Sequence, residues 1–361
     1  MNFTETRLGF SIGDVNGIGP EVLLKAFSNE VLFNHCTPVV YGSSSVLKFY
    51  MEELNIETEM DIYSVTSAKQ AKAGRLNVVD VQGADYKAQP GSPSKESGAL
   101  ALNSLLAAVE AVKNGEIENL VTLPIDKNTI QSETFNFAGH TDFLASTFTT
   151  EEYMMILCND DLRVGIVSGH VPITEVSKAV NPENLKTKID TLLHSLRFDF
   201  GVRKPKLAVL GLNPHSGDNG LIGKEEQEVI IPVIQSYIEA GELVYGPYAA
   251  DGFFGSGSFE QFDAILAMYH DQGLIPFKQI AFKDGVNYTA GLPIVRTSPD
   301  HGTAYDIAGK GVADADSLVA AIFATKTIYR NRLEYNELNK SPLGFKVHRK
   351  EKFSIGVPNL K

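Results

Sequence analysis

Short apolar runs of the length of a buried strand alternate along this chain with segments of helical character. Arg7 to Ile12, Thr37 to Tyr41 and Asn119 to Leu123 are three such runs, and the helical segments include Ser44 to Leu54 and Pro182 to Leu196. This alternation is typical of an α/β protein with a largely parallel sheet. Because the chain has 361 residues, more than one hydrophobic core usually contains, we expect two lobes.

One pair of runs departs from the alternation. Met154 to Leu157 and Leu162 to Val167 are joined across only Asn159-Asp-Asp161, so they predict an antiparallel hairpin. The hairpin indicates a mixed sheet, and we expect it to belong to a second lobe or a dimerisation arm.

Three of the apolar runs lead into a histidine, namely His170, His215 and His270. In α/β proteins ligands bind outside the carboxyl ends of strands. Three imidazoles at three strand ends suit a divalent metal with open positions for a substrate, and they lie too far apart in the sequence for a zinc finger. The alternative for His270 is that it only caps its strand.

The run Phe262 to Met268 is predicted to place His270, Asp271 and Gln272 on a turn at Gly273.

Near the N-terminus, glycines of the stretch Gly13 to Glu21 follow the first strand with the spacing G-x-x-x-G-x-G. This spacing differs from the Rossmann fingerprint. The stretch is either a tight strand-to-helix turn or a ligand-binding loop.

Composition excludes some functions. Asp and Glu number 44 against 32 Lys and Arg, a net charge of −12, which argues against nucleic-acid binding. Any anionic ligand must therefore be held by locally placed cations.

Cysteine usage indicates the compartment. The chain has two cysteines, Cys36 and Cys158, which we expect to be buried thiols in a reducing compartment. Without a signal-peptide pattern or a membrane-length apolar run, we expect a cytoplasmic protein with no membrane partner.

Five motifs occur in order along the chain: Gly13-Asp14…Gly17-Ile-Gly-Pro-Glu21, Gly139-His-Thr141, Leu212-Asn-Pro-His215, Ala267-Met-Tyr-His-Asp-Gln-Gly273 and Gly291-Leu-Pro…Arg296-Thr-Ser…Asp300-His-Gly-Thr-Ala304. Together they closely resemble the 4-hydroxythreonine-4-phosphate dehydrogenase family of vitamin B6 biosynthesis. The stretch from His301 to Gly311 also looks like the nucleotide-binding loop of isopropylmalate and isocitrate dehydrogenases.

The resemblance implies a non-Rossmann α/β fold like that of isocitrate and isopropylmalate dehydrogenases, with two lobes that each carry a mixed or parallel sheet. Residues 1–130 and 285–361 would form a nucleotide-side lobe, and residues 131–284 a central metal-binding and dimerisation lobe. The active unit is expected to be a homodimer with its metal site between the subunits.

The implied reaction is the oxidation of the C3 hydroxyl of 4-phosphooxy-L-threonine by NAD or NADP, followed by decarboxylation to 3-amino-2-oxopropyl phosphate. No arginine pair for a 2′-phosphate stands near His301, which favours NAD slightly. One divalent metal is expected per site, zinc first, with cobalt, magnesium or manganese as alternatives.

The resemblance also assigns site residues. The metal ligands would be His170, His215 and His270. The substrate would be bound by His140, Thr141, Lys278, Asn287 and Arg296, and the cofactor by Asp300, His301, Gly302, Thr303, Ala304 and Asp306. For the general base, Asp271 ranks before Asp251 and Lys127.

Two alternatives stay open. The chain departs from the common family pattern at Val15-Asn16 and at Asp142, and paralogues act on D-threonate or D-erythronate 4-phosphate, which carry a hydroxyl where the amino acid carries an amine. The second alternative is a phosphate-ligand binding or acyl-transfer protein that shares the architecture without the dehydrogenase chemistry.

Overall fold

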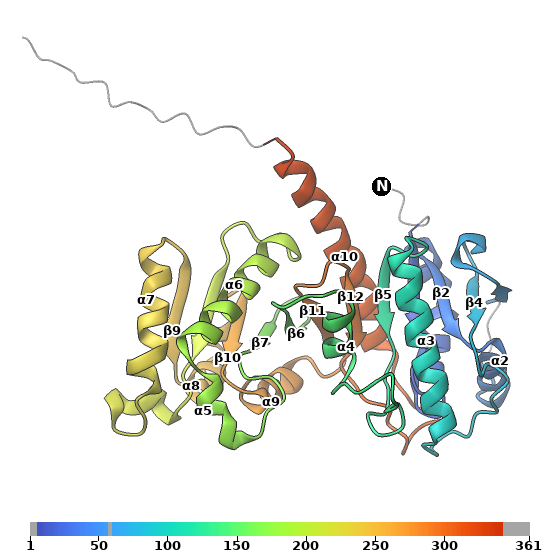
Figure 1. Ribbon diagram of the computed structural model, residues 1–361, viewed down its shortest axis with the longest axis horizontal. Coiled ribbons are helices and arrows are strands. Elements are labelled where there is room, and N and C mark those ends of the chain that lie inside the picture. The colour runs from blue at the N-terminus through green and yellow to red at the C-terminus, as the bar shows by residue number, and fades with distance from the viewer. Residues whose placement is uncertain (1–5, 57–59, 342–361) are drawn as a thin grey trace, which may run out of the picture.

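A computed structural model describes residues 6–56 and 60–341 (Figure 1). The described strands form one sheet of 12, in the order β3-β4-β2-β1-β5-β12-β11-β6-β7-β10-β8-β9. The strands are β1 (Arg7–Ser11), β2 (Thr37–Gly42), β3 (Ile62–Val65), β4 (Leu76–Asp80), β5 (Asn119–Thr122), β6 (Met154–Cys158), β7 (Arg163–Ile166), β8 (Lys206–Leu210), β9 (Leu243–Tyr248), β10 (Ala264–Ala267), β11 (Val286–Ala290) and β12 (Arg296–Pro299).

Helices flank the sheet on both faces (Figure 1). The α-helices are α1 (Gly19–Ser28), α2 (Ser44–Glu53), α3 (Lys95–Lys113), α4 (His140–Thr147), α5 (Val176–Ala179), α6 (Pro182–Phe198), α7 (Ile231–Glu239), α8 (Ala250–Gly255), α9 (His270–Ile280) and α10 (Asp316–Asn339). The shorter helical turns are η2 (Glu30–Asn34), η3 (Ala68–Gln70), η4 (Ile173–Glu175), η5 (Pro214–Gly220), η6 (Glu226–Ile230) and η7 (Ser258–Gln261).

The sheet changes direction at its centre. β12 pairs antiparallel with β11, β11 with β6, and β6 with β7, whereas the strands on either side pair parallel. The α/β class, the mixed sheet and the predicted hairpin are confirmed. The two sets of parallel strands do not form two separate sheets, because the antiparallel strands join them by continuous pairing.

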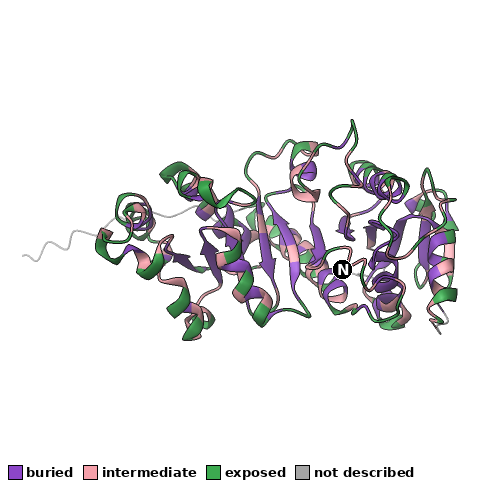
Figure 2. Ribbon diagram, turned by 90° about the horizontal axis from the view of Figure 1, so that it is seen from below, coloured by how far each residue is buried: buried purple, intermediate pink, exposed green. Residues whose placement is uncertain are grey.

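The central strands separate a core face from a cavity face. Successive side chains of a strand point to opposite sides, and the hydrophobic core that includes α1, α6 and α10 receives Ile156 from β6 and Tyr288 from β11. Asn287 and Arg296 point to the opposite side of the sheet, into the cavity. On that side, α4 and α9 pack into two hydrophobic clusters that are separate from each other. Figure 2 shows that the strands themselves are largely buried, so polar residues on their cavity face are enclosed.

The glycine-rich stretch after β1 is a tight strand-to-helix turn. A Cβ on Gly13 would lie 2.3 Å from the carbonyl oxygen of Pro124, and one on Gly17 would lie 2.7 Å from that of Thr303. Neither position has room for a side chain. The stretch therefore packs against the loops that follow β5 and β12.

The predicted turn at Gly273 is wrong. Helix α9 begins at His270 and continues through Gly273, and Leu274 and Phe277 bury one face of it. A Cβ on Gly273 would lie 2.8 Å from a methyl carbon of Val164. The glycine therefore allows close packing of the helix on the sheet, and helical spacing of the apolar residues outweighs its tendency to form turns.

Other features agree with the sequence. Asn181 caps α6 by accepting a hydrogen bond from the backbone N–H of Asn184, and Cys36 and Cys158 are free and buried. Within the described ranges no helix is long and apolar enough to cross a membrane. Residues 342–361 of the expected nucleotide-side lobe lie outside the described residues.

A buried ion pair joins the closing helix to the central strands. Arg332 of α10 donates from Nε to Asp199 Oδ1 at 2.7 Å, from Nη1 to the carbonyl oxygen of Leu292 at 3.0 Å, and from Nη2 to Tyr288 Oη at 2.9 Å. Both charged side chains are less than a tenth exposed. Removal of one partner from such a pair leaves an uncompensated buried charge.

We therefore expect Arg332→Met to lower the free energy of unfolding by about 3–5 kcal/mol, measured by urea denaturation. Arg330→Met is the matched control, since its exposed pair with Glu334 at 3.9 Å contributes at most about 1 kcal/mol. Equal effects of the two substitutions would contradict the role given to the buried pair.

Candidate active site

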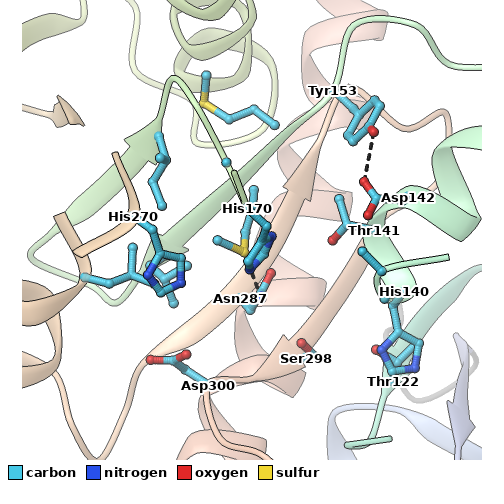
Figure 3. Close-up of a pocket in the computed structure, with 18 of the residues that line it drawn as sticks. Thr122, His140, Thr141, Asp142, Tyr153, His170, His270, Asn287, Ser298 and Asp300 are labelled. Atoms are coloured by element: carbon cyan, nitrogen blue, oxygen red, sulfur yellow. Dashed lines mark hydrogen bonds between the residues drawn. The ribbon is translucent and has the colours of Figure 1, made fainter. Parts of the chain in front are cut away.

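A cavity of about 680 Å³ opens on the cavity face of the central strands. Its walls come from the ends of β5, β7 and β12, from β6 and β11, from the start of α4 and from α9 (Figure 3). The residues expected to bind metal, substrate or cofactor that line it are Lys127, His140, Thr141, His170, His270, Lys278, Asn287, Arg296, Asp300, His301 and Gly302.

Arg296 is a buried cation in this wall, with 2% of its surface exposed. Its Nε donates to Thr122 Oγ1 at 3.0 Å and its Nη1 to Thr289 Oγ1 at 3.1 Å. Within the described residues it forms no ion pair with a carboxylate. Burial alone lowers the pKa of Arg296 to about 9. An anionic ligand would supply the missing counter-charge.

His140 and Thr141 begin α4 (Figure 3) and line the same cavity as Arg296. The Nε2 atom of His140 is buried without a hydrogen-bond partner. Burial, and then the positive charges of Arg296 and Lys127, hold the pKa of His140 well below its usual value. The ring is therefore neutral near pH 7 and offers one N–H and one lone pair to a ligand.

His170 and His270 face each other across the middle of the cavity, with ring centroids 5.3 Å apart (Figure 3). The Nδ1–H of His270 donates to Asp271 Oδ1 at 2.7 Å, which leaves its Nε2 free to act as a ligand. Partial burial lowers the pKa of His170 and favours its neutral ring. Two imidazoles placed in this way fit a divalent cation.

His215 lies apart from these two rings. It is exposed, sits in the turn η5 after β8, and is not among the residues that line the cavity. No group of three His, Cys, Asp or Glu side chains suited to a metal forms in residues 6–56 and 60–341. The three histidines do follow three neighbouring parallel strands, β7, β10 and β8, but one chain brings only two of them together.

Lys278 and Asp300 form an ion pair at 3.1 Å at another wall of the cavity. Burial raises the pKa of Asp300, against the opposing effect of Lys278. His301 follows, with its Nε2 buried and unpaired and its pKa lowered by burial. At this wall of the cavity, Lys278 balances the charge of Asp300, and the imidazole of His301 is neutral.

The rest of the expected cofactor loop lies outside the cavity. The carbonyl oxygen of Thr303 accepts a hydrogen bond from the N–H of Ile18 at 2.9 Å. Ala304 has a φ of 43°, and Asp306 is exposed. The structure therefore brings Asp300, His301 and Gly302 to the cavity and directs Thr303, Ala304 and Asp306 away from it.

The three candidate bases differ in position. Asp251 is exposed in α8 and Asp271 is exposed at the start of α9, and neither lines the cavity. Lys127, in the loop after β5, does line it. Of the three, only Lys127 lies where it can reach a molecule bound in the cavity of its own chain.

Unpaired polar atoms gather at this cavity. Among the described side chains, His140 Nε2, Ser168 Oγ, Asn287 Oδ1 and His301 Nε2 are buried without a hydrogen-bond partner, and all four residues line the cavity. Buried polar atoms in proteins are usually paired, and these four are the ones among the nine unpaired atoms of the described side chains that line the cavity. Their concentration here indicates that a polar ligand completes the hydrogen bonding.

Some lining residues were not predicted. Thr122, at the end of β5, and Ser298, two residues after Arg296 on the same strand face, could have been found from strand alternation. Lys188 of α6 also lines the cavity, where it donates to the carbonyl oxygen of Tyr153 at 2.9 Å and burial lowers its pKa. Nothing in the local sequence distinguishes Lys188 from a surface lysine.

Comparison with known proteins shows which proteins this chain is similar to. The chain is 46% identical over 344 residues to a 4-hydroxythreonine-4-phosphate dehydrogenase of Bacteroides thetaiotaomicron, covering 95% of this chain and 94% of that protein. It is 39% identical over 332 residues to the protein of the same name from Prosthecochloris aestuarii, covering 90% and 97%.

A solved structure of a 4-hydroxythreonine-4-phosphate dehydrogenase from Klebsiella pneumoniae superimposes with a TM-score of 0.78 at 32% identity, covering 91% of this chain and 99% of that one. The resemblance carried by the five motifs is confirmed, and so is the expectation of a dehydrogenase. The family model for the pyridoxal phosphate biosynthetic protein PdxA matches residues 34–325. The chain therefore belongs to the PdxA family.

Proposed function

We propose that this chain oxidises and decarboxylates 4-phosphooxy-L-threonine with NAD or NADP, in the synthesis of pyridoxal phosphate. The observation that carries the proposal is the buried guanidinium of Arg296, which has hydroxyl partners but no ion pair within the described residues. A substrate with a phosphate at one end and a carboxylate at the other supplies the anion that this cavity lacks.

The two anionic ends of the substrate would be held by different residues. Arg296 binds one end, assisted by His140 and Thr141. Lys278 and Asn287 lie at other walls of the same cavity and are suited to the other end. With both ends held, the C3 hydroxyl would lie between them, near His170 and His270.

A divalent cation is expected at these two rings, with zinc first and cobalt, magnesium or manganese as alternatives. When bound, it would supply Lewis-acid stabilisation of the negative charge that develops on the substrate during oxidation and decarboxylation. His170 and His270 would hold it from one chain, and the exposed His215 from a second copy. Lys127 is best placed to accept the hydroxyl proton, because it lines the cavity.

The nicotinamide cofactor is expected against Asp300, His301 and Gly302, which line the same cavity. There it would receive the hydride from C3. Thr303, Ala304 and Asp306, which lie outside the cavity, would contribute only to the more distant parts of the cofactor.

A homodimer would explain the exposed apolar residues near the histidines. Leu221 follows the His215 turn and is 82% exposed, and Phe282 follows α9 and is 80% exposed. Ile173, three residues after His170, is 70% exposed. Exposed apolar surface of this kind is what a subunit interface would cover. A second copy that covers them would also bring its His215 to the cavity.

The first test follows cofactor reduction by absorbance with purified protein, a divalent metal, and 4-phosphooxy-L-threonine or D-threonate 4-phosphate, each with NAD and NADP. Turnover is expected to favour the amino acid. Preference for the sugar acid would support the alternative substrate, and absence of turnover with both would contradict the proposed reaction.

Arg296→Met should raise KM at least about 30-fold, corresponding to about 2 kcal/mol of lost binding, because the anion loses its buried partner. The unfolding midpoint of the free protein should not fall, since an unpaired buried charge is removed. Arg197→Met is the control, because Arg197 pairs with Glu242 outside the cavity. A KM unchanged in Arg296→Met would refute the anion-binding role.

Subunit complementation tests the shared site. His215→Ala and Arg296→Met homodimers should each be nearly inactive. After mixing with subunit exchange, each heterodimer regains one intact site, so about one quarter of wild-type activity should return in a statistical mixture. Lack of recovery, with exchange verified by mass spectrometry, would show that His215 acts within its own chain or not at all.

A further inference from the structure

The turn that carries His215 has an unusual backbone conformation. Five consecutive residues, 215 to 219, have φ angles between 43° and 81°, and only Gly217 among them is a glycine. Residues with a side chain rarely adopt this left-handed region, and hardly ever in succession. Contacts from outside the turn must therefore hold it in place.

The carboxylate of Glu226 packs against this turn and accepts hydrogen bonds from the residues that lead into it. Glu226 begins the π-helical turn η6 and is 1% exposed. Its Oε1 accepts hydrogen bonds from the backbone N–H groups of Leu212 and Asn213, each at 2.7 Å, and its Oε2 accepts one from Asn213 Nδ2 at 2.9 Å. A Cβ on Gly217 would lie 2.6 Å from Oε2, so the carboxylate packs directly against the turn.

The same region is tied to the stretch that carries His270. Gln272 accepts a hydrogen bond from the N–H of Met268 at 2.7 Å and donates from Nε2 to the carbonyl oxygen of Gly211 at 2.6 Å. Its amide therefore bridges the ends of β10 and β8. Gly211, where the loop that carries His215 begins, therefore has a fixed position relative to α9. Further along the same loop, Glu226 packs against Gly217.

We propose that Glu226 is a positioning residue, whose buried carboxylate holds the left-handed turn and thereby fixes the imidazole of His215 in the orientation required by a divalent cation shared with a second copy. The inference rests on the proposed function, in which His215 is a metal ligand. Glu226 itself contacts neither the metal nor the substrate. Its effect is expected on metal affinity and on the exchange of the amides that it accepts from.

The test measures Co²⁺ binding to the purified full-length protein by visible absorbance, in competition with a chelator. Glu226→Gln should weaken Co²⁺ binding by about 10- to 100-fold, the usual effect of losing a group that orients a metal ligand. The amide protons of Leu212 and Asn213 should exchange faster in the metal-free variant, because the neutral glutamine oxygen accepts hydrogen bonds more weakly than a carboxylate oxygen. Glu228→Gln, an exposed position on the same turn, should behave as wild type.

A variant with a lower unfolding midpoint but unchanged Co²⁺ affinity would reduce Glu226 to a structural role and overturn the inference. If Glu226→Gln does not fold, Asn213→Ser replaces it, because it removes one donor to the carboxylate and should weaken Co²⁺ binding in the same direction; unchanged affinity there overturns the inference too. Failure of the wild type to bind Co²⁺, or equal binding by His215→Ala, would contradict the metal role of His215 in the proposed function.

Discussion

The arrangement of the cavity depends on Arg296, an arginine buried at the centre of the sheet that has no carboxylate partner among residues 6–56 and 60–341. Burial of a cation costs several kcal/mol even after the protein relaxes. The hydroxyl groups of Thr122 and Thr289 offset part of this cost, and the lowered pKa of Arg296 reflects the remainder. The cavity is thus prepared for an anion before any ligand binds.

The direction change in the sheet makes that burial possible. If the sheet were parallel throughout, helical crossovers would be expected to cover both faces of its central strands. Three antiparallel pairings at β12, β11, β6 and β7 need no such crossover, and the cavity-facing side of these strands stays open between α4 and α9. Asn287 and Arg296 therefore project into a cavity. Tyr288, which follows Asn287 on β11, points to the other face and packs into the core.

The histidines are positioned by two kinds of constraint. His170 and His270 follow neighbouring strands of one chain, so the sheet alone brings their rings together. His215 depends on a turn with four non-glycine residues in the left-handed region, a conformation that costs about 1–2 kcal/mol for each such residue. Glu226 accepts hydrogen bonds from Leu212 and Asn213, which lead into the turn, and its carboxylate packs against Gly217. Together with the hydrogen bond from Gln272 to Gly211, these contacts offset the unfavourable backbone conformation.

The sequence by itself determined the alternation of strands and helices, the hairpin at β6 and β7, and the placement of His170, His215 and His270 after strands, because these follow from apolar periodicity. Its five motifs also determined the family. The helix through Gly273, the joining of all strands into one sheet, the position of Lys188 and the separation of His215 from the other two histidines were decided only by the tertiary structure. Each of these depends on packing between segments distant in the chain, which local periodicity does not encode.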